Sequence, residues 1–177
     1  GKCFWLRVYE IPEGSKTSKG RAIQNLVSIE QDDKVKAFIC TQDLKDENYI
    51  NNHYVVMATK KGQVKKTSLE QYSRPRVNGI NAITIREGDE LLEAKLTTGS
   101  SQVVLAVKSG KAIRFEESKT RPMGRNASGV RGIKLSNISD EVVGMVAVND
   151  LDTDILVVSE NGYGKRSKLE DYRITNR

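Results

Sequence analysis

Residue types that carry chemistry in many enzymes are scarce in this chain of 177 residues. It has one histidine, His53, and two cysteines, Cys3 and Cys40. The cysteines lack the spacing of zinc ligands or of a disulfide framework, so we interpret them as small core hydrophobes in a reducing compartment. His53 has no Ser, Cys or Asp at a motif spacing, which argues against a nucleophile and base pair. We therefore expect no catalytic residue, metal site or cofactor within the chain itself.

Long apolar runs are absent as well. No run approaches the roughly 20 residues that cross a bilayer, and the N-terminus has no secretory pattern, so a cytoplasmic protein is expected. Helical periodicity is confined to residues 68–72, 115–119 and 168–172. The rest consists of short runs rich in β-branched residues and closed by Gly, Asn, Asp or Pro, which is typical of strands. The sequence predicts an all-β fold.

One pattern recurs: an apolar run, a glycine-centred turn and then a basic run. The turn glycines are Gly62, Gly110 and Gly162, which lie 48 and 52 residues apart. A period near 50 residues with about four short strands is typical of one blade of a propeller-like array. We predict one partial array over residues 1–177, with repeats at 1–52, 53–100, 101–152 and 153–177. The first repeat lacks the apolar strand expected before Gly1, and the last stops early, so we expect a segment of a longer chain.

Positive charge is concentrated at the turn and second strand of each repeat. The net charge is +6, yet residues 60–76 carry +5 and residues 108–125 carry +4, whereas residues 22–59 and 126–159 each carry −3. Equivalent positions of a repeat array share one face, so a curved basic stripe is predicted, which favours a bent polyanion as partner. The predicted stripe consists of Lys65, Lys66, Arg74, Arg76, Lys111, Arg114, Lys119, Arg121, Arg125, Lys165, Arg166 and Arg173.

Solubilising lysines at strand edges are the alternative for any single hairpin. Recurrence in register favours a binding surface instead. The chain has neither a recognition helix nor a zinc finger, and aromatic residues do not alternate with its cations, so phosphate contacts are expected rather than base readout or stacking. Residues 161–167 lack the spacing of a phosphate loop, and we interpret them as a hairpin turn in which Asn161 and Gly162 take positive φ.

Four stretches carry a resemblance to a known family. They are RVYEIPE at 7–13, KGQVKKTSLEQYSR at 61–74, SGKAIRFEESKTRPMGRNASGVRGIKL at 109–135 and ENGYGKRSKLEDY at 160–172. They closely resemble the C-terminal domain of the DNA gyrase A protein, and the resemblance covers essentially the whole chain. It implies a six-bladed β-pinwheel with strand exchange between blades, whose basic rim wraps duplex DNA. This chain would hold a little over three blade equivalents.

The resemblance also implies a mechanism and partners. Wrapped DNA would be led into the cleavage core of the gyrase A protein, with ATP hydrolysed, in the presence of Mg²⁺, by the gyrase B protein of an A2B2 holoenzyme at the nucleoid. The rim positions carried over are Lys65, Lys66, Arg114, Lys165 and Arg166, joined by Arg121, Arg125 and Arg131. The family's glutamine-arginine-glycine-lysine box is absent from residues 1–177. One alternative is the corresponding protein of topoisomerase IV. An alternative of a different functional class is a propeller that binds proteins.

Overall fold

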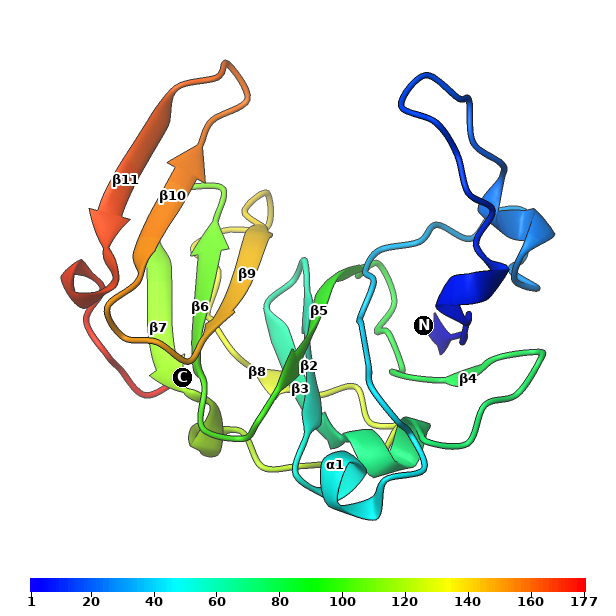
Figure 1. The fold of residues 1–177 in the computed structure, drawn as a ribbon. Helices are drawn as coiled ribbons and strands as arrows, with labels where there is room; N and C mark the ends of the chain where they lie inside the picture. Colours follow the sequence, from blue (N-terminus) through cyan, green and yellow to red (C-terminus); the bar gives the residue numbers. More distant parts are fainter.

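The chain folds into antiparallel sheets joined by loops and short 3₁₀ helices (Figure 1). A computed structural model describes all 177 residues. Its one α-helix is the five-residue α1 (Glu47–Asn51), which begins where the Asp46 carboxylate accepts bonds from the amides of Asn48 and Tyr49. The prediction of an all-β, propeller-like fold is confirmed.

The second and third repeats each form a sheet with the same plan. In the second, the strand order is β5 (Leu91–Thr97), β2 (Tyr54–Thr59), β3 (Gln63–Ser68) and β8 (Val130–Arg131). In the third it is β7 (Ala112–Glu116), β6 (Gln102–Val107) and β9 (Val142–Val148). The fourth repeat contributes the hairpin of β10 (Asp154–Val158) and β11 (Gly164–Lys168). In both complete sheets the first apolar strand lies in the centre.

Neighbouring repeats exchange a short strand. β4 (Ile80–Asn81) leaves its own repeat and pairs with β1 (Lys2–Cys3), and β8 pairs with β3 in the same way. The amide of Ala82 donates to the carbonyl of Gly1 at 2.8 Å, and the amide of Gly132 donates to that of Gly62 at 2.8 Å. The same joint is therefore built twice, which agrees with the strand exchange that the resemblance implies.

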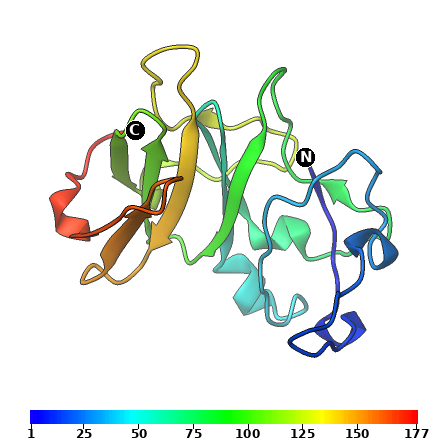
Figure 2. The same ribbon diagram turned by 90° about the horizontal axis from the view of Figure 1, so that it is seen from above.

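Successive sheets stack face to face, with a core between each pair (Figure 2). On β2, Val56 and Ala58 join the core shared with the third repeat, whereas Val55 and Met57 join the core shared with the first. A central strand therefore buries both faces, which explains why β2 and β6 are continuous apolar runs rather than alternating ones.

The brief helical patterns become 3₁₀ turns after each basic strand: η3 (Leu69–Tyr72), η4 (Glu117–Lys119) and η5 (Leu169–Asp171). The turn glycines adopt φ of 86°, 85° and 82° at Gly62, Gly110 and Gly162. Asn161 does not take positive φ, because no residue other than glycine does so in this chain.

The first repeat departs from the expected plan. The sequence predicts strands at 1–11, 20–29 and 33–40, but only β1 is a strand, with η1 (Val8–Glu10) and η2 (Ile23–Asn25) elsewhere. Strands need a hydrogen-bonded neighbour, and residues 34–41 make no backbone hydrogen bond. Cys40 is exposed in this segment, so its assignment to the core was wrong, whereas Cys3 is half-buried.

Candidate nucleic-acid interface

Lys65 lies inside the protein rather than on the predicted rim. Its side chain on β3 is fully buried, and Nζ donates to the carbonyls of Ala82 and Arg125, both at 2.5 Å. Desolvation by burial, with a smaller contribution from the Arg125 charge, lowers the pKa of Lys65 to about 8. The prediction that Lys65 contacts phosphate is therefore wrong, because its donors are used internally.

Lys66 is also buried, and it joins two repeats. Its Nζ lies 3.1 Å from the Glu117 carboxylate and 4.3 Å from the centre of the Tyr54 ring. Glu117, which belongs to the next repeat, also accepts bonds from Thr97 Oγ1 at 2.7 Å and from the Ser101 amide at 3.1 Å. The prediction for Lys66 is corrected in the same way: this cation has a buried carboxylate partner.

Arg114 occupies the same register position on β7 that Lys66 occupies on β3. It is buried and donates to Gln102 Oε1 at 2.6 Å and to the carbonyls of Leu169 and Tyr172 at 2.8 and 3.0 Å. In the first repeat the equivalent residue is Trp5, whose Nε1 donates to the Tyr72 carbonyl at 3.0 Å. This position is thus a joint between repeats, and Arg114 is not an exposed phosphate contact here.

Backbone hydrogen bonds also link neighbouring repeats at this position. The amide of Met123 donates to the Lys66 carbonyl, and the amide of Thr175 donates to the Arg114 carbonyl, both at 2.8 Å. The loops that follow η4 and η5 are therefore fastened to the preceding sheet in the same way. Recurrence of a cation in register at this position reflects how the sheets stack.

The exposed arginines lie on these connecting loops. Residues 73–81, 120–131 and 173–177 carry seven arginines, which we call the connector arginines; none of them has a carboxylate within 4.0 Å. All are exposed except Arg125, which is half-buried. The connector arginines are Arg74, Arg76, Arg121, Arg125, Arg131, Arg173 and Arg177.

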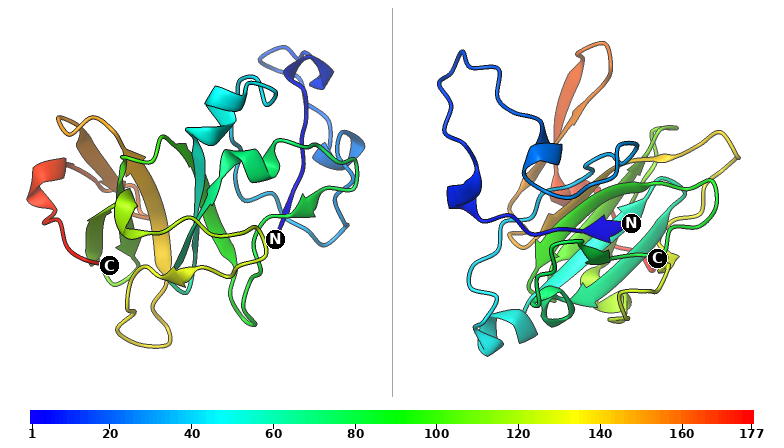
Figure 3. Two further views of the ribbon diagram at one scale, coloured as in Figure 1. Left: turned by 90° about the horizontal axis from the view of Figure 1, so that it is seen from below. Right: turned by 90° about the vertical axis from the view of Figure 1, so that its right-hand side faces the viewer.

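Arg177 is the member that the sequence-based prediction missed. Its NH1 donates to the Arg131 carbonyl at 3.4 Å, as NH1 of Arg125 donates to the Asn81 carbonyl at 3.4 Å. The signal was present in the sequence, because an arginine pair four residues apart occurs at 121 and 125 and recurs 52 residues later. Figure 3 (left) shows the 117–131 segment crossing the face turned to the viewer, with the C-terminus beside it.

The remaining predicted cations lie on hairpins, apart from Lys119 on η4. Lys111 is exposed beside the turn of the third repeat, where Nζ donates to Ser136 Oγ at 3.2 Å. Lys119 is exposed on η4, and its carbonyl accepts a bond from Nε of Arg177 at 2.8 Å. Lys165 is exposed on β11, and the neighbouring Arg166 pairs with Asp154 at 3.2 Å.

No group of three or more His, Cys, Asp and Glu side chains is placed to hold a metal ion. No helix is long and apolar enough to pass through a bilayer. The surface offers unpaired guanidinium groups, which suit the oxygen atoms of phosphate esters because they donate in a planar fork.

Known proteins resemble this chain along its whole length. It matches the family described as the DNA gyrase C-terminal domain, beta-propeller, over residues 1–42, 53–98, 102–149 and 153–177. The DNA gyrase A protein of Staphylococcus epidermidis is 43% identical over 178 residues, which cover 100% of this chain and 19% of that protein. The same protein of Staphylococcus aureus is 42% identical, with 20% of its length covered. The chain thus spans about a fifth of these relatives.

Solved structures share the fold. The C-terminal domain of DNA topoisomerase IV superimposes with a TM-score of 0.85 at 28% identity, covering 100% of this chain and 53% of the other. The DNA gyrase A C-terminal domain gives a TM-score of 0.82 at 24% identity and covers 54% of that chain. With four matched segments in one array and relatives above 40% identity, this chain belongs to the DNA gyrase C-terminal domain family.

Proposed function

We propose that this chain binds duplex DNA without sequence preference through its connector arginines and bends it around the outside of the array. The single observation that carries the proposal is that these arginines have no carboxylate partner and lie on the connecting loops of three successive repeats, where the pair Arg121 and Arg125 recurs as Arg173 and Arg177. An unpaired surface cation attracts a polyanion over roughly a Debye length, about 8–10 Å at ordinary salt. Contacts of this kind hold phosphates and carry no base information.

Bending requires several contacts to act together. Curving 20–30 base pairs costs on the order of 1–6 kcal/mol, which exceeds what one exposed ion pair supplies. The arginines recur once per repeat, so a duplex that follows them meets a new contact as it passes each sheet. The spacing of the repeats then sets the curvature of the DNA.

In the longer protein this binding would serve ATP-dependent negative supercoiling by DNA gyrase. The gyrase A proteins of the two staphylococci, of which this chain covers about a fifth, support that assignment. The cleavage core of gyrase A, the gyrase B protein in an A2B2 assembly, and ATP with Mg²⁺ would be supplied outside residues 1–177. The catalytic chemistry belongs to those parts, and this chain would hold the DNA.

The corresponding protein of topoisomerase IV is the second candidate, favoured by the structural match to the C-terminal domain of that enzyme. The two proteins differ in the glutamine-arginine-glycine-lysine box, so the sequence beyond this chain discriminates between them. A protein-binding propeller is less well supported, because its surface would not need unpaired arginines in three successive connections.

The test is a salt-dependent gel shift with unrelated duplexes of equal length. Changing Arg121, Arg125, Arg173 and Arg177 to Gln should reduce the slope of log affinity against log salt by about 0.9 for each phosphate that is no longer neutralised, hence by about 3–4. The matched control changes four exposed cations to Gln that lie outside the connecting loops and have no carboxylate within 4.0 Å: Lys34, Lys45, Arg86 and Lys134. An equal reduction in both variants, or a reduction confined to one DNA sequence, would contradict the proposal.

Curvature needs its own measurement. A closed circular plasmid relaxed and religated with bound protein should keep a change in linking number that grows with occupancy. The variant lacking the four arginines should leave the plasmid unchanged at a protein concentration where the control variant shifts it. Binding without a change in linking number would agree with DNA binding but contradict wrapping.

A further inference from the structure

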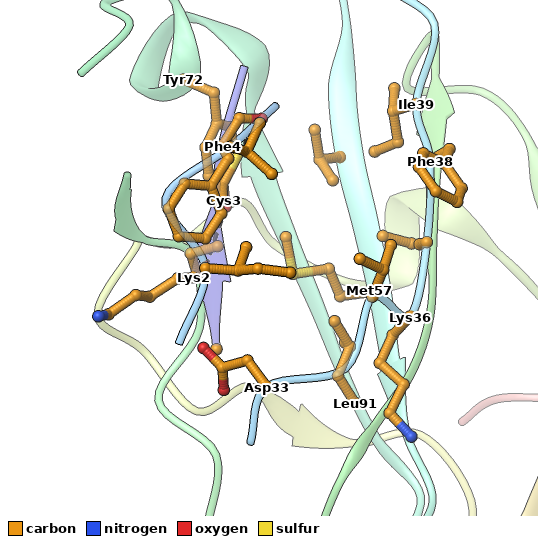
Figure 4. A pocket seen from close by; sticks show the side chains of 18 of the residues that line it. Lys2, Cys3, Phe4, Asp33, Lys36, Phe38, Ile39, Met57, Tyr72 and Leu91 are labelled. Atoms are coloured by element: carbon orange, nitrogen blue, oxygen red, sulfur yellow. Dashed lines mark hydrogen bonds between the residues drawn. The ribbon is translucent and has the colours of Figure 1, made fainter. Parts of the chain in front are cut away.

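Lys65 holds two segments of the chain together from the inside. It is the register partner of Met57, so both side chains lie on the face of the second sheet that packs against the first repeat. Met57 and Tyr72 line the apolar pocket drawn in Figure 4 on this face. The Lys65 ammonium donates to the carbonyl of Ala82, which follows β4, and to that of Arg125 on the next connecting loop. One buried cation therefore joins two connections.

Further polar contacts link the same two segments. NH1 of Arg125 donates to the Asn81 carbonyl at 3.4 Å, and the hydrogen bond between the side-chain amides of Asn81 and Asn126 spans 2.9 Å. The Thr84 hydroxyl donates to the Asn126 carbonyl at 2.7 Å. Arg125 is one of the connector arginines, so its position depends on how firmly its loop is held against residues 80–84.

No carboxylate compensates the charge of Lys65. None lies within 4.0 Å of Nζ, and a buried charge without a counter-charge is costly. The equivalent residue of the third repeat is Ile113, which follows Gly110 by three residues as Lys65 follows Gly62. The fold therefore accepts an apolar residue at this position. A buried cation that the fold does not require indicates a function at this place.

We propose that Lys65 is an internal cation of the DNA interface and that it takes up a proton from solvent when DNA binds, which rests on the proposed function of the connector arginines. Lys65 contacts no phosphate itself. It holds the loop that carries Arg125 and places a positive charge beneath that loop.

Binding of DNA changes the charges around Lys65. Burial and, to a smaller extent, the charge of Arg125 lower the pKa of Lys65 to about 8 in the free chain. A phosphate that pairs with Arg125 offsets the repulsion between the two cations and adds a negative charge that favours the ammonium form. The pKa of Lys65 is therefore higher in the complex. Coupling is reciprocal, so the protonated chain binds DNA more tightly than the neutral one.

The affinity for DNA should then depend on pH in one direction. Below about pH 8, Lys65 carries its proton in the free chain and in the complex, so the affinity is constant. Above this value the free chain loses the proton and regains it on binding. The affinity therefore falls as pH rises, until the pH reaches the pKa of Lys65 in the complex.

The other titratable groups around Lys65 are separable from it. Burial raises the pKa of Cys3 to about 11 and that of Tyr72 to about 12, both above the relevant range. The amine of Gly1 titrates within the range, because burial lowers its pKa from 8.0. Arginine stays charged throughout. Acetylation of Gly1 therefore removes the one competing titration.

The test compares DNA affinity from about pH 7 to about pH 9 at constant ionic strength in the unaltered chain and in Lys65→Met, which cannot hold a proton. The affinity of the unaltered chain should fall by about five- to tenfold, as expected when a pKa rises by about one unit or more on binding. Lys65→Met should bind with nearly constant affinity. Lys165→Met, the same change at the same register position of the fourth repeat, should keep the pH dependence, and so should the chain acetylated at Gly1.

Carbon-13 NMR of labelled lysine supplies a second measurement that needs no variant. The titration of Lys65 should move to higher pH when a duplex is bound. An equal pH dependence in the unaltered chain and in Lys65→Met, or an unchanged Lys65 titration in the complex, overturns this inference while DNA binding stands. Absence of DNA binding at every pH overturns the proposed function and this inference with it.

Discussion

Replacing Lys66 with Met tests whether this cation joins two repeats or holds DNA. The change leaves the fully buried Glu117 carboxylate without its counter-charge, although the Thr97 hydroxyl and the Ser101 amide still donate to it. Removing one partner of a buried pair costs about 3–5 kcal/mol. The two remaining donors place the expected loss at the lower end, at about 3 kcal/mol in the free energy of unfolding.

The reverse change gives the same loss for the opposite reason. Glu117→Gln leaves the buried Lys66 ammonium without a counter-charge, next to a neutral amide and the face of the Tyr54 ring. The double variant removes both charges, so it should cost little more than either single change. That result corresponds to a coupling energy of about 3 kcal/mol in a double-mutant cycle.

Urea unfolding followed by circular dichroism measures the cycle, and a gel shift on the same proteins measures the salt slope. Lys66→Met should lower stability and leave the slope unchanged. Arg121→Gln is the matched control: its stability should stay within about 0.5 kcal/mol and its slope should fall by about 0.9. A stable Lys66→Met protein with a reduced slope would refute the joint and restore Lys66 as a phosphate contact.

Local geometry gives three further predictions. Gly129 has φ of 88°, and a Cβ added there would lie 2.6 Å from a carbonyl oxygen of β3. Gly110 has a similar φ, but a Cβ there would meet no atom within 4 Å. Gly129→Ala should therefore lower the free energy of unfolding in urea by more than Gly110→Ala does. Burial raises the pKa of Tyr72 to about 12. The stability that the neutral phenol contributes is therefore complete below the usual pKa of 10.0 and is lost as pH rises toward 12. In Tyr72→Phe the urea midpoint should depend less on pH over that range. Arg114→Met should lose about 2–3 kcal/mol, whereas Arg166→Met, at the same register position but exposed, should lose less than about 1 kcal/mol.

The repeat and its turns could be predicted because they depend on local patterns. Glycine at the hairpin turns is required by φ values above 80° at Gly62, Gly110 and Gly162. Apolar runs before these glycines indicated strands. Both features are properties of a few consecutive residues, and tertiary structure did not override them.

The burial of Lys65, Lys66 and Arg114 could not be predicted in the same way. A basic strand beside a turn has the composition of an exposed edge, and only the stacking of the next sheet covers it. The sequence does contain partners, such as Glu117 at the start of a 3₁₀ turn, but nothing local indicates that this carboxylate reaches the preceding repeat. The spacing of Arg121 and Arg125, repeated later, was the better signal for an exposed surface.

The strand predictions for the first repeat were wrong for a related reason. Residues 33–40 have the alternation of a strand, yet a strand is defined by its hydrogen-bonded neighbour, and this segment has none. An alternating sequence pattern shows that a segment can form a strand, but whether it does depends on a neighbouring strand to pair with.

The joint and the proposed DNA contacts are mechanically linked although they involve different residues. The loops at 120–131 and 173–177 are fastened to the preceding sheet by equivalent backbone bonds, from Met123 to Lys66 and from Thr175 to Arg114. The position of the arginines relative to one another therefore follows the stacking angle of the sheets. If the loops hold phosphates as proposed, a change at a buried joint alters the path of the DNA while every loop cation still meets its phosphate, and the salt slope stays unchanged. The affinity for DNA then depends on the cations of the loops, whereas the curvature of the bound DNA depends on the buried joints.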